Sequence, residues 1–319
     1  MQEHSVGSQP EMPGGKGAAA TEFPGKLFLN ATGLRAGWRL LLYTVMFFAL
    51  LVSSSWVLVQ VARPVRGSFS PSFQFCAELI SLLSALGAAW IMCRMERRTM
   101  GIYGFPALQA FGKLFWQGCL FGLFEILTLI GLIAAFGGYS FGSLAEHGIQ
   151  ILWWALFWGA FFIVVGFFEE FLFRGYTLYT LADGLGFWPA AILLSLVFAA
   201  VHFQNSGEDR TGVAGVLLVG LFWSFTLKRT GSLWFAMGMH AMFDFGETFL
   251  FSVPDSGMVF PGHLSNATLH GPKWLTGGNP GPEGSVIDFA ILLLFFVVFD
   301  RLHPARRAEH SGLSQHKMP

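Results

Sequence analysis

The sequence predicts an all-α, polytopic integral membrane protein with about eight transmembrane helices. Of its 319 residues, 54% are hydrophobic and only 12% are charged, whereas about a quarter of the residues in a soluble domain are charged. Its 36 phenylalanines and 11 tryptophans are residues that lipid and membrane interfaces favour. Its apolar runs approach the ~20 residues that a helix needs to cross the hydrocarbon core. These observations exclude an ordinary soluble domain, a disordered chain and a coiled coil.

Eight apolar segments are separated by charges and by clusters of glycine and proline. They are 38–62, 72–95, 111–136, 151–181, 187–203, 211–227, 231–250 and 286–302. Polar tails are predicted at 1–37, which we expect to be disordered, and at 303–319. Residues 38–302 then form one membrane domain, in which the Gly- and Pro-rich stretch 252–285 is expected to be weakly ordered.

The basic residues predict the orientation of these segments. When both termini are placed in the cytoplasm, only four of the 19 lysines and arginines fall in outer loops, namely Arg63, Arg66, Arg210 and Lys273. This asymmetry follows the positive-inside rule. The 19 acidic residues cancel the basic charge, so the chain has no net field to attract nucleic acid. The three cysteines lie in apolar runs and are predicted to be free thiols.

Ionisable side chains inside a spanning helix cost several kcal/mol, so each needs a structural or functional reason. The fourth segment contains Glu169, Glu170 and Arg174 in an aromatic run. Glu170 and Arg174 have the spacing of a helical ion pair, whereas Glu169 points about 100° away from Glu170. The structural alternative to a functional site is that these three residues form an ion-paired group that ends the span at the membrane interface. Glu125 is the single acid of the third segment. A hydrogen bond to a neighbouring helix would explain its presence there as well as a functional role would.

Two histidines and an aspartate in other segments favour a functional site. His202 ends the apolar run of the fifth segment, and His240 and Asp244 share one face of the seventh. At a rise of ~1.5 Å per residue, these residues and Glu169 all lie about 14 to 22 Å from the inner ends of their helices. The side chains can therefore meet inside the membrane. Such a group can bind a divalent metal with an open position for water, or its carboxylate can act as a general base. Both routes lead to hydrolysis of an acyl bond.

These residues form three motifs in a fixed order on separate segments. The motifs are Glu169-Glu170-Phe171-Leu172-Phe173-Arg174, Phe198-Ala199-Ala200-Val201-His202 and His240-Ala241-Met242-Phe243-Asp244. They resemble the Glu-Glu-x-x-x-Arg, Phe-x-x-x-His and His-x-x-x-Asn/Asp motifs of the CAAX prenyl protease and bacteriocin-processing (Abi) family of intramembrane proteases. The resemblance covers about residues 150–250. Each motif alone is weak evidence, whereas the three in order are specific.

The resemblance implies an intramembrane endopeptidase with an all-helical core around a cavity inside the bilayer. Glu169 would be the catalytic glutamate that activates water, and Glu170 and Arg174 would support it. His202 would be the second catalytic or metal-binding residue, with Phe198 packed beside it. The partner would be a peptide or protein substrate, such as a C-terminal or membrane-inserted segment, and the location a bacterial cell membrane.

The resemblance also implies that His240 and Asp244 complete the site, as ligands or as groups that stabilise an oxyanion. It leaves a metal-bound and a metal-free route to activated water open. The metal would be a divalent ion such as Zn²⁺, held by Glu169, His202, His240 and Asp244. Asp244 stands where eukaryotic relatives have Asn, which favours a metal slightly. Glu247, one turn further along, could extend the site or be a charge at the end of a span.

Other functions are less well supported. No His-Glu-x-x-His motif occurs. Residues 138–142 fit G-x-S-x-G, but they lie in a predicted outer loop without the strand–turn–helix context of that motif, so we expect a flexible Gly-rich turn. An ion- or proton-coupled transporter would also use buried acids and histidines, although we find no internal repeat. A catalytically silent, immunity-type membrane protein is the third alternative.

Overall fold

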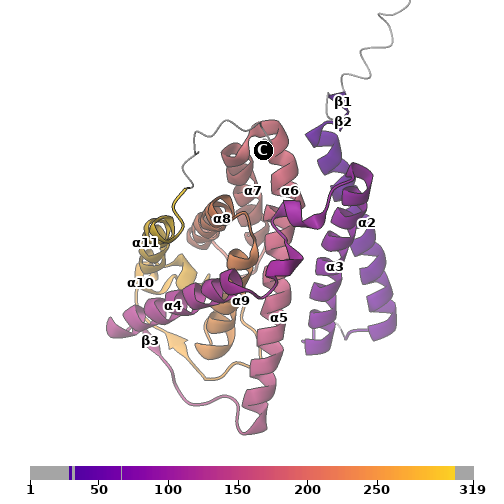
Figure 1. Cartoon of the computed structure of the whole chain (residues 1–319). Helices are drawn as coiled ribbons and strands as arrows, with labels where there is room; N and C mark the ends of the chain where they lie inside the picture. Colours follow the sequence, from indigo (N-terminus) through magenta and orange to yellow (C-terminus); the bar gives the residue numbers. More distant parts are fainter. Residues whose placement is uncertain (1–28, 31–32, 66, 306–319) are drawn as a thin grey trace, which may run out of the picture.

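The described part of the chain is built almost entirely from helices (Figure 1). The computed structural model describes residues 29–30, 33–65 and 67–305. The longer helices are α2 (Ala36–Ala62), α3 (Pro71–Glu96), α4 (Lys113–Ala135), α5 (Ile149–Arg174), α8 (Arg210–Thr230) and α11 (Val286–Leu302). The shorter ones are α6 (Tyr176–Leu185), α7 (Phe187–His202), α9 (Trp234–Phe245) and α10 (Lys273–Thr276), with the single turns η1 (Met100–Tyr103), η2 (Ala107–Gln109), η3 (Gly246–Leu250) and η4 (Pro282–Gly284).

The helices confirm the prediction of an all-α, polytopic membrane protein. Five helical stretches of the described residues are long and apolar enough to cross a membrane, namely α2, α3, α4, α5 continued by α6, and α8. All eight predicted segments coincide with helices. However, α7, α9 and α11 have 16, 12 and 17 residues, which is fewer than the ~20 of a full span. The number of spans therefore stays a prediction.

Two of the predicted segments differ from the structure in local detail. The fourth is not one continuous helix, because α5 ends at Arg174 and α6 begins at Tyr176. Gly175 occupies the break, where a Cβ atom would lie only 2.4 Å from the carbonyl oxygen of Phe171. The seventh segment begins as α9 and continues as the π-helical turn η3. In both places the helix changes course within a segment that looks uniform in composition.

The stretch 252–285 is folded, so the expectation of weak order is wrong. Its strand β4 (Thr268–Leu269) pairs antiparallel with β3 (Tyr139–Ser140), and its side chains Val253 and Leu275 are buried in the core. The G-x-S-x-G sequence therefore contributes a short strand rather than a flexible turn. The predicted tails lie largely outside the described residues. The described part of the first tail contains the short pair β1 (Leu29–Asn30) and β2 (Gly33–Leu34) and the first two residues of α2.

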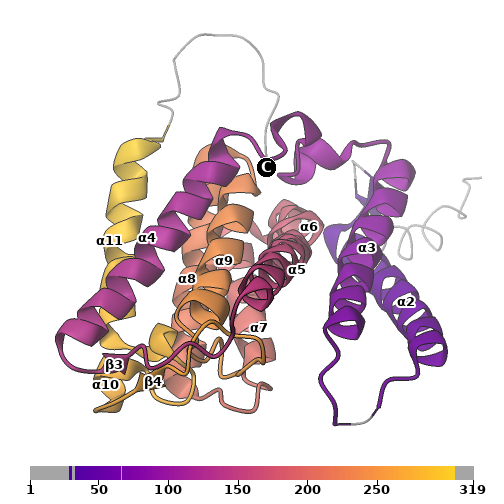
Figure 2. The same ribbon diagram turned by 90° about the horizontal axis from the view of Figure 1, so that it is seen from below.

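The helices form two groups on either side of α5 and α6. Helices α2 and α3 lie side by side as a hairpin, and α4, α8, α9 and α11 lie on the opposite side (Figures 1 and 2). A polar network fastens the hairpin to α6, because the Arg39 guanidinium donates hydrogen bonds to Glu96 and Asp183. Tyr103 and Tyr176 also donate to the Glu96 carboxylate.

Glycines bring α4 and α9 into backbone contact. A Cβ atom on Gly118 would lie 2.0 Å from the Phe235 carbonyl oxygen, and one on Gly122 would lie 2.4 Å from that of Met239. From the other side, a Cβ atom on Gly238 would lie 2.2 Å from the Phe115 carbonyl oxygen. Small residues four apart are the usual means of close helix packing in membranes. This contact fixes the position of α9, which carries His240 and Asp244.

Candidate active site

Helix α5 brings a fully buried ion pair into the centre of the molecule. Arg174 Nη1 donates a 2.8 Å hydrogen bond to Glu170 Oε1, and neither side chain is more than 2% exposed. The guanidinium carbon lies 4.3 Å from the centre of the Phe198 ring and 5.3 Å from that of Trp223. Arginine suits such a place because its planar cation both stacks on aromatic rings and forms hydrogen bonds.

His240 on α9 is held between acids and an aromatic ring. Its Nδ1 lies 3.1 Å from Glu170 Oε1, and its Nε2 lies 3.2 Å from Asp244 Oδ2. The imidazole stacks on Trp223 with the ring centres 4.4 Å apart. Ionised carboxylates only accept hydrogen bonds, so acids at both ring nitrogens favour a proton on each. The Nε2 atom of His240 therefore carries a proton and can donate a hydrogen bond.

His202, at the end of α7, has one nitrogen occupied by the backbone. Its Nδ1 lies 2.9 Å from the Phe198 carbonyl oxygen, which can only accept, so Nδ1 carries the proton of that bond. In the neutral ring, Nε2 is then an acceptor, and it is directed at the Glu169 carboxylate. Two acceptors facing each other require a donor between them. A water molecule is the simplest group that satisfies both.

Glu169 is the carboxylate that both histidines face. Its Oε2 lies 3.8 Å from His202 Nε2 and 3.7 Å from His240 Nε2, beyond the range of a direct hydrogen bond. Its side chain is 20% exposed, whereas that of the neighbouring Glu170 is fully buried. Glu169 Oε2 is itself buried and has no hydrogen-bond partner among the described residues, so it can accept a hydrogen bond from water, while Glu170 is engaged by Arg174 and His240.

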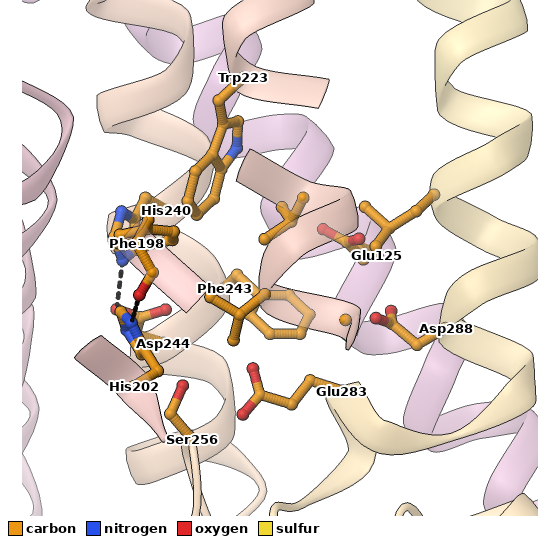
Figure 3. A pocket seen from close by; sticks show the side chains of 14 residues that line it. Glu125, Phe198, His202, Trp223, His240, Phe243, Asp244, Ser256, Glu283 and Asp288 are labelled. Carbon is orange, nitrogen blue, oxygen red and sulfur yellow. Dashed lines mark hydrogen bonds and ion pairs between the residues drawn. The ribbon is translucent and has the colours of Figure 1, made fainter. Parts of the chain in front are cut away.

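A cavity of about 40 Å³ adjoins this group of side chains (Figure 3). His202, His240 and Asp244 form part of its lining. Glu125 on α4, Glu283 on η4 and Asp288 on α11 line the part away from the histidines, with Phe243 between the two ends. Polar side chains from several helices thus surround a space in the middle of an otherwise apolar bundle.

The comparison with known families supports the resemblance seen in the three motifs. Residues 151–246 match the family model described as "Rce1-like: Type II CAAX prenyl endopeptidase Rce1-like". These residues form an Rce1-like domain. The match includes all three motifs and confirms the resemblance to the CAAX protease family. No curated protein and no solved structure matches the chain.

The Rce1-like domain contains every site residue that the sequence predicts, and the structure brings all six into one connected group. They are Glu169, Glu170, Arg174, His202, His240 and Asp244. Their catalytic roles stay predictions. Glu247 does not reach this group by a hydrogen bond, and both of its carboxylate oxygens are buried without a partner among the described residues.

Sequence reasoning missed three residues around the Rce1-like site. Asp288 and Glu283 line the cavity, although one begins the last helix and the other precedes it. Asp288 lies in the first turn of α11, where an acidic residue is common and gives little sign of a site. Trp223 stacks on His240, but nothing in the sequence distinguishes it from the other ten tryptophans.

The predicted metal ligands have suitable donor atoms but not the convergence of a metal site. Carboxylate oxygens and imidazole nitrogens are the atoms that zinc prefers. Within residues 29–30, 33–65 and 67–305, however, no three histidine, cysteine, aspartate or glutamate side chains converge as the ligands of one ion do. The predicted zinc site therefore stays a prediction.

Proposed function

We propose that the chain is an intramembrane endopeptidase that hydrolyses a peptide bond with a water molecule activated by Glu169. The chain is an integral membrane protein with a domain of a protease family. The observation that carries the mechanism is the position of Glu169 Oε2, which both histidine Nε2 atoms face at 3.7 to 3.8 Å. This arrangement supplies a base and two polar partners for one water molecule and one carbonyl group.

The proposed reaction begins with proton transfer from water to the Glu169 carboxylate. The water oxygen attacks the scissile carbonyl carbon, and the carbonyl oxygen becomes an oxyanion. The N–H of His240 Nε2, which also faces Asp244, donates a shared hydrogen bond to that oxygen, while His202 Nε2 accepts one from the attacking water. The carbon–nitrogen bond then breaks as the amine takes the proton from Glu169, which restores the carboxylate.

The other three predicted residues hold this arrangement in place. Glu170 accepts hydrogen bonds from Arg174 and His240, and Asp244 fixes the Nε2 side of the His240 ring. Charge inside an apolar bundle is stabilised only by such pairing. We propose that Glu170, Arg174 and Asp244 are positioning residues, so that their loss changes the geometry of Glu169 and His240.

The test is cleavage by the purified protein reconstituted in lipid vesicles. Glu169→Ala, His202→Ala and His240→Ala should each reduce cleavage of a membrane-inserted peptide by at least about 1000-fold, because each removes a group in contact with the reacting atoms. Glu146→Ala, in the loop before α5, is the matched control and should cleave normally. Cleavage that survives all three site substitutions would place the activity elsewhere.

The substrate can be sought in cells. Membrane peptides from cells that express the wild-type protein should contain cleaved fragments that are missing with Glu169→Ala. We propose that the substrate is a C-terminal or membrane-inserted segment of a protein in a bacterial cell membrane, with both termini of the enzyme in the cytoplasm. An unchanged peptide profile, together with substrate flux across the membrane, would favour the transporter alternative.

Zinc dependence is a separate part of the proposal, and it concerns Glu169, His202, His240 and Asp244. Elemental analysis of active purified protein decides between the two routes: stoichiometric zinc that is lost in a variant with both His202→Ala and His240→Ala would favour the metal-bound route. Active protein without a stoichiometric metal would contradict this part and leave the glutamate–water mechanism intact.

A further inference from the structure

The cavity beside the candidate active site has an unusual charge. Glu125, Asp244, Glu283 and Asp288 line it, and they come from four different elements. No lysine or arginine is among the described residues that line this cavity. The histidines are its only basic groups, and they are engaged by Glu169, Glu170 and Asp244 at one end. Beside the carboxyl groups at the other end, no residue of the described lining carries a charge of opposite sign.

These carboxyl groups are also buried, and two of them are incompletely hydrogen bonded. Glu125 is 2% exposed, Asp288 3% and Glu283 9%. Asp288 Oδ1 and Glu283 Oε1 have no hydrogen-bond partner among the described residues, and Figure 3 shows both carboxyl groups turned toward the space around Phe243. An unpaired buried acceptor costs about 1 to 3 kcal/mol or more. A group of them facing one cavity points to a ligand that pairs with them.

The loop residue Glu283 shows the cost of this arrangement. Burial, reinforced by the nearby carboxyl groups of Asp255 and Glu208, raises the pKa of Glu283 well above its usual range. A cation that entered the cavity would remove this repulsion. Natural proteins retain such unfavourable clusters where binding or catalysis needs them.

The size of the cavity limits what can enter. A site for one water-sized group needs about 10 to 15 Å³, so a cavity of about 40 Å³ holds roughly three. The ammonium group of a lysine and its last two methylene groups are of this size. The indole N–H of Trp223, which also lines the cavity, has no partner among the described residues. It can donate to a carbonyl group, which a peptide supplies and a bare ion does not.

We propose that this cavity is a specificity pocket that receives the ammonium end of a lysine side chain of the peptide substrate. Because His202, His240 and Asp244 line the same cavity, the lysine belongs to a residue next to the scissile bond. Glu125, Glu283 and Asp288 are then the residues that determine specificity. The pocket's affinity for an alkylammonium ion stands independently, whereas its role with a peptide rests on the proposed function.

The first test measures binding and needs no cleavage. The probe is n-butylammonium chloride, added to the purified full-length protein in detergent, with sodium chloride at equal ionic strength and 1-butanol as controls. Of the three additives, only butylammonium should raise the thermal unfolding midpoint, and it should do so in a saturable manner. Asp288→Asn and Glu283→Gln should each weaken its apparent affinity about 10-fold or more, because each removes a charged hydrogen-bond acceptor.

The thermal stability of the variants without ligand also shows whether the acidic side chains of the cavity stabilise the fold or destabilise it. Without ligand, Asp288→Asn should unfold at the same temperature as the wild type or a higher one, because it relieves repulsion between buried acids. A purely structural carboxylate would give the opposite result. Asp300→Asn is the matched control, since it removes a carboxylate near the other end of α11 and outside the cavity. It should respond to butylammonium as the wild type does.

The second test compares peptides that carry lysine or the neutral norleucine at each position around the scissile bond. At one position, lysine should raise kcat/KM by about 10- to 100-fold. Asp288→Asn should remove this preference, so that kcat/KM for the lysine peptide becomes similar to that for the norleucine peptide. Acetylation of the peptide's N-terminus should have no effect; a loss of cleavage would instead assign the pocket to a terminal amine and overturn the lysine proposal.

The outcomes separate the two proposals. No response of the wild type to butylammonium, or a response of Asp288→Asn and Glu283→Gln equal to that of the wild type, would overturn the pocket. Stabilisation by calcium, magnesium or zinc ions but not by butylammonium would also overturn it, in favour of a metal site. Binding of butylammonium by a protein that cleaves no peptide would leave the pocket intact and remove only its role in proteolysis.

Discussion

Two adjacent glutamates in this chain have different environments, and this difference predicts different roles. Glu170 is fully buried and accepts hydrogen bonds from Arg174 and His240, whereas Glu169 is partly exposed and faces both histidines without a direct hydrogen bond. A carboxylate that holds other residues and a carboxylate that acts on water should respond differently to the same substitution.

We predict that Glu170→Gln destabilises the protein and that Glu169→Gln does not. Glu170→Gln removes the partner charge of a buried arginine, which costs about 3 kcal/mol. Glu169→Gln breaks no direct hydrogen bond and should change the unfolding free energy by less than about 0.5 kcal/mol while it abolishes cleavage. The measurements are the thermal midpoint and the cleavage rate of each purified variant. Equal destabilisation by both would contradict the division of roles.

The sequence predicted the residues of the active site better than those of the adjoining cavity. Glu169, His202 and His240 were identified because charge is costly in an apolar segment. Asp288 and Glu283 lie at the boundary between a loop and a helix, where charge is common and carries little information. Only the folding of the loop over the bundle buries them, and that depends on contacts between distant parts of the chain.

At the scale of helices, the candidate site depends on the close approach of α4 and α9. We predict that Gly122→Ala destabilises the protein by about 1 to 3 kcal/mol, because its Cβ atom would lie 2.4 Å from the Met239 carbonyl oxygen and overpack the contact. Because Met239 precedes His240, cleavage should also fall. The measurements are the thermal midpoint and the cleavage rate.

Gly131→Ala is the matched control on the same helix. Nothing lies within 4 Å of a Cβ atom at Gly131, so alanine should stabilise α4 by up to about 1 kcal/mol through its higher helix propensity. If both variants behaved alike, helix propensity rather than contact with α9 would govern this part of α4.

The start of α8 supplies a test in acid. Asp209 caps the helix by accepting a hydrogen bond from Thr211 N, and it pairs with Lys273 from the loop 252–285. Burial opposes ionisation of Asp209, but hydrogen bonds from Lys273 and Thr211 lower its pKa to about 2. The unfolded value is about 3.9. The resulting stabilisation is therefore present above about pH 4 and is lost as the pH falls toward 2.

We predict that the wild type loses more stability than Asp209→Asn between pH 5 and pH 2. Asparagine retains a capping side chain but cannot titrate, so the comparison isolates the charge. The difference should stay below about 1 kcal/mol, because the Asp209 side chain is one-third exposed and solvent screens its ion pair. Unfolding midpoints of both proteins across this range are the measurement, and parallel curves would contradict the prediction.

At the scale of the whole molecule, composition predicted the architecture because the bilayer restricts spanning segments to a few forms. The apolar segments and their helical state could be read directly from the sequence. The break at Gly175 and the folded loop 252–285 could not, because a glycine in an apolar run and a Gly- and Pro-rich stretch are compatible with several conformations. Close contacts with the rest of the bundle select one of them.

The attachment of the α2–α3 hairpin to the rest of the molecule depends on a small polar network, and this gives the last prediction. Arg39 Nε and Nη2 donate to the two Glu96 oxygens at 2.9 and 3.0 Å, and Nη1 donates to Asp183 on α6 at 2.7 Å. Arg39→Met should destabilise the protein by about 1 to 3 kcal/mol, because it removes three charged hydrogen bonds from Glu96 and Asp183 and leaves only the more distant Arg98 beside them, at 3.8 and 3.9 Å. Arg94→Met, at an exposed position near the end of α3, should cost less than about 0.5 kcal/mol. Thermal midpoints in detergent compare the two variants. Equal midpoints would show that apolar packing alone holds the hairpin, whereas selective loss in Arg39→Met would show that the Arg39 network holds the hairpin against α6.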